Sequence, residues 1–87
     1  MMHSIEGDMV EKEKYLKIAL ESLLKVFSEA GARATIEVMA KSKLAAMTDV
    51  SQGIINDCNS VLYERVKMLK GDAVAVQFLS SIKAASG

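Results

Sequence analysis

The sequence predicts a small all-α domain of four helices, two of them long, that is completed by self-association. Apolar residues recur at steps of three and four, a spacing that places them on one side of a helix. The 87 residues include no proline, which fits long uninterrupted helices. Hydrophobic residues make up 51% of the chain and aromatic residues only 5%. A chain this short has a thin core, so we expect a second copy to extend it.

The first residues have a composition different from the rest. Residues 1–8 include two acidic residues, a serine and a histidine, and we expect them to form a flexible N-terminal segment. His3, the sole histidine, falls in this segment, where we expect a solvated side chain and not a ligand. Residues 9–85 are predicted to form a single helical domain.

A first long helix is predicted from residue 8 or 9 to Ala30, because Gly31 then interrupts the pattern. A second helix is predicted from Ala32 to Met47. The apolar stripe of the first helix comprises Leu16, Ala19, Leu20, Leu23, Leu24 and Phe27.

The most regular stretch runs from Thr48 to Gly71. Thr48 or Asp49 can cap a helix, since a short side-chain oxygen accepts a hydrogen bond from a first-turn N–H. Gly71 can adopt the left-handed conformation that ends many helices. The apolar stripe between them comprises Val50, Ile54, Ile55, Cys58, Val61, Leu62, Val66 and Leu69. We therefore expect this helix to be central to the fold, with Cys58 buried.

A last helix is predicted from Ala73 to Ala85, with Asp72 as its cap. The apolar residues Val74, Val76 and Phe78 also alternate as a strand would, so periodicity alone leaves two readings. The alanine, glutamine, leucine and lysine content favours helix.

The charged and polar composition argues against several classes of protein. Eleven basic and eleven acidic residues give zero net charge, which removes the overall electrostatic footprint of a strong nucleic-acid binder. We find no metal-binding or phosphate-binding motif, and we expect no catalytic, cofactor-binding or metal-binding residue. The single cysteine cannot form an internal disulfide, and no apolar run is long enough to span a membrane. We therefore expect a cytoplasmic location and no membrane partner.

One segment resembles a known motif. Residues 41–60, KSKLAAMTDVSQGIINDCNS, resemble the helix-turn-helix of bacterial and phage repressors, with matches at Leu44, Ala45, Val50, Ser51, Gln52, Ile55 and Cys58. The resemblance implies that Ala45 lies at the close crossing of two helices. It also implies a set of nucleic-acid contacts. That set is Lys41, Lys43, Ser51, Gln52 and Asn56, with Asn59 as a further candidate on the same helix. The alternative is that residues 48 and 49 form an ordinary capped turn between two helices of a bundle.

We expect first a non-enzymatic helical protein that acts by self-association and protein–protein interaction, as a regulator, an adaptor or a small subunit. A homo-oligomer, foremost a dimer, is expected, with a further protein partner that the sequence does not identify. The residues expected to form the core and interface are Leu16, Leu20, Leu23, Leu24, Phe27, Ile55, Val61, Leu62, Val66 and Leu69. The second reading is a small helix-turn-helix DNA-binding transcriptional regulator. A carrier of an apolar ligand is a third and weaker reading.

Overall fold

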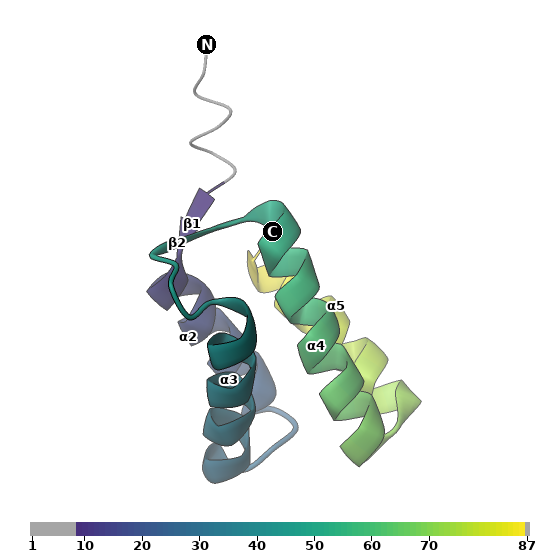
Figure 1. The fold of residues 1–87 in the computed structure, drawn as a ribbon. Helices are drawn as coiled ribbons and strands as arrows, with labels where there is room; N and C mark the ends of the chain where they lie inside the picture. Colours follow the sequence, from purple (N-terminus) through teal and green to yellow (C-terminus); the bar gives the residue numbers. More distant parts are fainter. Residues whose placement is uncertain (1–8, 87) are drawn as a thin grey trace.

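The computed structural model describes residues 9–86, and the side chains of residues 10–85. Within this range the chain forms four helices and one two-stranded sheet (Figure 1). In chain order the elements are β1 (Met9–Glu11), α2 (Lys12–Leu23), α3 (Glu29–Lys43), β2 (Asp49–Ser51), α4 (Gln52–Lys70) and α5 (Asp72–Ser86). The predicted all-α class is thus confirmed. The expectations for residues 1–8, including His3, lie outside the described residues.

The sheet was not foreseen. β1 and β2 pair antiparallel, with Val10 opposite Val50. The backbone N–H of Lys12 also donates to the carbonyl of Thr48 at 2.9 Å, which satisfies a donor of the first turn of α2. Each strand has only three residues, too few for an alternating pattern to stand out from a helical one. The first helix therefore begins at Lys12, later than predicted.

The predicted first helix is also shorter at its other end. α2 ends at Leu23, and the backbone turns through residues 24–28 before α3 begins. Ser28 caps α3, because its Oγ accepts a hydrogen bond from the N–H of Gly31 at 3.3 Å. Gly31 was expected to end a helix, but it lies in the first turn of α3. The serine cap, not the glycine, sets the boundary.

α4 is the longest helix of the described chain and follows the prediction over most of its length. It begins at Gln52, later than the predicted Thr48, because residues 49–51 belong to β2 and Ser51 acts as the cap. Its C-terminal neighbour Gly71 has φ 96° and ψ 168°, backbone angles that only glycine adopts readily. The chain can therefore turn sharply into α5, whose helical state resolves the ambiguity at residues 73–85.

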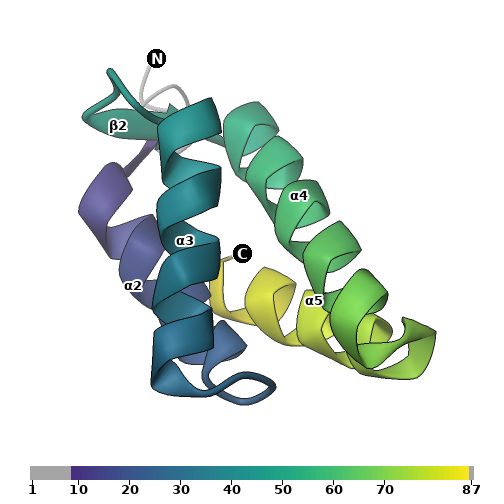
Figure 2. The ribbon, with the colours of Figure 1, turned by 60° about the horizontal axis from the view of Figure 1, so that its bottom comes forward.

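The helices form a closed ring around the core. α3 packs against α2 and α4, and α5 packs against α4 and α2. Figure 2 shows α2 and α3 running in opposite directions along one side, with α4 and α5 on the other. Lys25 in the turn after α2 donates from Nζ to Ser81 Oγ of α5 at 3.1 Å, which joins the two sides.

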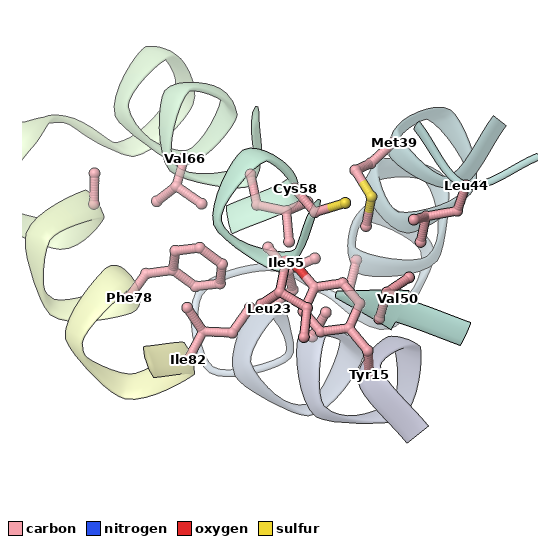
Figure 3. Packing of buried hydrophobic residues seen from close by; sticks show 14 residues of the cluster. Tyr15, Leu23, Met39, Leu44, Val50, Ile55, Cys58, Val66, Phe78 and Ile82 are labelled. Atoms are coloured by element: carbon pink, nitrogen blue, oxygen red, sulfur yellow. The ribbon is translucent and has the colours of Figure 1, made fainter. Parts of the chain in front are cut away.

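Side chains from all four helices and from β2 meet inside the ring (Figure 3). α2 contributes Tyr15 and Leu23, and β2 contributes Val50, all three fully buried. The fully buried apolar residues of α4 are Ile55, Cys58, Leu62 and Val66, as their spacing predicted. Asn59 is buried with them, so it does not face outward as the helix-turn-helix resemblance implied. One polar pair lies in this core: Tyr15 Oη donates to Asn59 Oδ1 at 2.6 Å.

Candidate association surface

α2 presents apolar side chains to two sides. Tyr15, Ala19 and Leu23 recur every four residues and point into the core, where each is fully buried. Leu16, Leu20 and Leu24 follow each of these by one residue and therefore lie about 100° further round the helix. Leu16 and Leu20 are only half-buried, and Leu24 is 42% exposed. We call these three residues the outer leucine stripe; a single chain leaves it incompletely covered.

Two residues of the outer leucine stripe lie at an open groove of about 720 Å³ between α2 and α3, and the third, Leu24, lies outside its lining. Leu16 and Leu20 line it from α2, and Ala30, Ala34 and Ile36 line it from α3. The two alanines are exposed and small, so the backbone of α3 is accessible to a closely approaching partner. We call this feature the α2–α3 groove.

Four charged side chains complete the lining of the α2–α3 groove. Glu13 and Lys17 come from α2, and Arg33 and Glu37 come from α3. All four are exposed, and their charges cancel. Arg33 also forms an ion pair within its own helix, from Nε to Glu29 Oε2 at 3.0 Å, with both side chains well exposed. An exposed pair of this kind is weak, about 0.3–0.5 kcal/mol, so Arg33 can exchange Glu29 for another carboxylate.

A smaller groove of about 210 Å³ lies between α3 and α4. Val38 and Met68 line it and are 61% and 74% exposed. Val61 lies beside them and is half-buried. This smaller groove provides a second apolar surface, on the face of α3 opposite the α2–α3 groove.

The predicted core and interface residues fall into three groups. Leu23, Ile55, Leu62 and Val66 are buried within one chain. Leu16, Leu20, Phe27 and Val61 are half-buried against the core. Leu24 and Leu69 are exposed, the latter at 56%, so they do not belong to the core of a single chain. Whether the exposed residues form an interface stays a prediction.

The residues that resemble a helix-turn-helix are arranged differently from that motif. Its two helices are joined by a turn of about 3–4 residues. Here residues 44–51 connect α3 to α4 and include strand β2. Ala45 is exposed in this connection and does not lie at a helix crossing.

The predicted nucleic-acid contacts lie around this connection. Lys41 and Lys43 are exposed in the last turn of α3. Ser51 is half-buried, and its Oγ caps α4 by accepting from the N–H of Ile54 at 3.3 Å. Gln52 and Asn56 are exposed on the first turns of α4, and Gln52 Nε2 donates to Asn56 Oδ1 at 3.4 Å. DNA contact by these residues stays a prediction.

Cys58 is fully buried, as expected. Burial raises the pKa of its thiol, Lys43 acts to lower it, and Asp57 acts to raise it. Lys43 belongs to the last turn of α3, so the residue spacing along α4 gives no indication of this cation. Burial is the larger effect, so the thiol stays protonated and behaves as a small apolar side chain.

Within residues 9–86 no group of three or more histidine, cysteine, aspartate or glutamate residues is placed to hold a metal ion. None of the helices described is both long and apolar enough to cross a membrane. The fold defines the class of this protein as a small all-α domain with a minor two-stranded sheet. No protein-family model, curated protein or solved structure matches the chain.

Proposed function

We propose that this protein is a non-enzymatic association module, which binds a second copy of itself and, in the assembled state, a further protein. One observation carries the proposal: α2 is apolar on two sides, and the rest of the chain buries one of them fully but the other only in part. Burying a leucine side chain fully contributes about 1.5–3 kcal/mol relative to full exposure. The outer leucine stripe keeps part of that free energy available for association.

The size of the chain supports the same proposal. A domain below about 100 residues buries a smaller share of its surface than a larger domain does. Exposed apolar residues such as Val38 and Met68 add to the surface that association can cover. With a single buried cysteine, the module suits a reducing compartment such as the cytoplasm.

Size-exclusion chromatography with light scattering tests the proposal directly. We expect a mass of twice 9.4 kDa at micromolar concentration. A mass of 9.4 kDa up to the highest soluble concentration would contradict it.

The same measurement with added duplex DNA tests the second reading, a DNA-binding regulator. Retention of DNA that falls with salt, and that Gln52→Ala and Lys43→Ala both weaken, would support that reading instead. Native mass spectrometry of the same sample tests the third reading, since a co-purified apolar molecule would appear as added mass.

A further inference from the structure

The charged side chains of the α2–α3 groove are sorted along its length. α2 and α3 run in opposite directions (Figure 2), so the beginning of α2 lies beside the later part of α3. Glu13 and Glu37 therefore share the end of the groove nearer the sheet, which we call the acidic end. Lys17 and Arg33 lie further towards the turn at residues 24–28, and we call theirs the basic end. Both helices therefore present an acidic residue and then a basic residue in the direction from the sheet to this turn.

This order makes the groove complementary to itself in one orientation only. A two-fold axis that lies in the interface, at a right angle to the long axis of the groove, places the second groove on the first and reverses its direction. The acidic end of one copy then faces the basic end of the other, twice, as the symmetry of an isologous interface requires. A parallel arrangement would place acidic end on acidic end and basic end on basic end, and like charges facing each other in an interface are costly.

We propose that the α2–α3 groove binds the same groove of a second copy in this antiparallel orientation, forming a four-helix interface with α2 and α3 from each chain. The inference rests on the proposed function and specifies its site and partner. Leu16 and Leu20 of each copy lie against those of the other, and the small side chains of Ala30 and Ala34 permit the helices to approach closely. Helices that pack in this way lie about 8–10 Å apart.

The balance of charge favours a second copy over other occupants. Two carboxylates and two cations around one apolar groove give no net positive charge to attract a nucleic acid or an anionic surface. The acidic and basic ends are nevertheless distinct, so the groove selects a partner with the opposite order. A second copy in reversed direction has that order.

Three charge variants test both the site and the orientation. The first, Lys17→Glu with Arg33→Glu, makes all four charged groups of the groove acidic. The second, Glu13→Lys with Glu37→Lys, makes all four basic. The third, the swap variant, combines all four substitutions, which reverses the acidic and basic ends and keeps the net charge at zero.

The expected results follow from which ends face each other. The all-acidic and all-basic variants each lose at least about tenfold in dimer affinity, because like charges then face each other throughout. An equimolar mixture of these two variants forms a mixed dimer. The swap variant forms a dimer with itself, but it does not form a mixed dimer with the wild-type chain. In each mixture, native mass spectrometry separates the mixed dimer from the two dimers of identical chains by mass.

A matched control carries charge changes on the same helix outside the groove. Lys14 and Glu21 are exposed on α2 and do not line the groove. We expect Lys14→Glu with Glu21→Lys to leave the dimer affinity within about twofold, since charges away from a contact contribute little. Far-ultraviolet circular dichroism of every variant checks that it is folded.

The outcomes separate this inference from the proposed function. A wild-type chain that is monomeric at all concentrations removes the proposed function itself. A wild-type dimer whose affinity the all-acidic and all-basic variants leave unchanged keeps the proposed function but overturns this site. A swap variant that pairs preferentially with the wild-type chain overturns the antiparallel orientation.

Discussion

The buried hydrogen bond between Tyr15 and Asn59 allows a quantitative test of the core. Tyr15 is fully buried and Asn59 is 2% exposed, and the hydroxyl donates to the amide oxygen at 2.6 Å. Tyr15→Phe removes the donor and leaves Asn59 Oδ1 buried without a hydrogen bond from this hydroxyl. Asn59→Leu removes the acceptor and leaves the hydroxyl buried. Each single substitution is expected to lower the free energy of unfolding by about 1–3 kcal/mol.

The double variant distinguishes this cause from a general loss of packing. When both partners are replaced by apolar side chains of similar shape, no polar atom of the pair remains unsatisfied, and the change is close to neutral. We therefore expect the double variant to be more stable than the sum of the two single effects predicts, by about 2–6 kcal/mol of coupling free energy, which is that sum itself.

Urea unfolding followed by circular dichroism is the assay, at one fixed protein concentration because association adds to the apparent stability. With a slope of about 1 kcal/mol/M for a small domain, each single substitution moves the midpoint down by about 1–3 M. An unchanged midpoint for Tyr15→Phe, or a double variant as unstable as the two single effects added, would show that this hydrogen bond does not stabilise the core.

Three further predictions concern the backbone turn, a helix cap and pH. Gly71→Ala is expected to lower the free energy of unfolding by about 1–3 kcal/mol in thermal or urea unfolding, because φ is 96° at this position. The space around Gly71 is open, so the backbone conformation and not a steric contact causes the loss. A loss below about 0.5 kcal/mol would contradict that conformation. Ser51→Ala is expected to cost about 1 kcal/mol by loss of its bond to the first turn of α4, whereas Ser51→Asn should retain most of the stability. Burial raises the pKa of both Tyr15 and Cys58. As pH rises, the unfolded chain therefore releases these protons before the folded chain does, and the free energy of unfolding should fall above about pH 8.5, the ordinary thiol pKa. In Tyr15→Phe the part of this fall that occurs above about pH 10 should be smaller. An equal fall in the wild-type chain and in Tyr15→Phe would exclude Tyr15 as its source.

The sequence was sufficient where one physical pattern governed a long segment. The spacing of Ile55, Cys58, Leu62 and Val66 predicted the buried face of α4, because a 19-residue helix repeats that spacing often enough to be unambiguous. Gly71 predicted the end of the same helix through its backbone freedom. The helical state of α5 followed from composition once the strand alternative was weighed.

Boundaries were less predictable because two local signals competed. The apolar stripe of the first helix continues through Leu24 and Phe27, so nothing in its periodicity marks an end at Leu23. The cap at Ser28 decides the boundary, whereas the prediction relied on Gly31. The strands β1 and β2 depend on pairing between residues about 40 positions apart, which no local pattern contains.

The leucines of the candidate surface belong to the predicted apolar stripe of the first helix, but the stripe does not distinguish them from the buried residues. Leu16, Leu20 and Leu24 were grouped with Leu23 because all four are apolar and closely spaced. Only the packing of α2 against its neighbours separates the buried residues from the outer ones. The order of charge along the groove likewise depends on α2 and α3 lying antiparallel.

Association of two chains through the α2–α3 groove requires a small side chain at position 34. Sedimentation equilibrium of the wild-type chain and of Ala34→Glu measures this requirement, with Ala73→Glu on α5 as the matched control. Both alanines are exposed, and a glutamate costs a helix well under 1 kcal/mol relative to alanine. We predict a dimer for the wild-type chain and the control, and a folded monomer for Ala34→Glu. A wild-type monomer, or an Ala34→Glu dimer as tight as that of the wild-type chain, would contradict association through this groove.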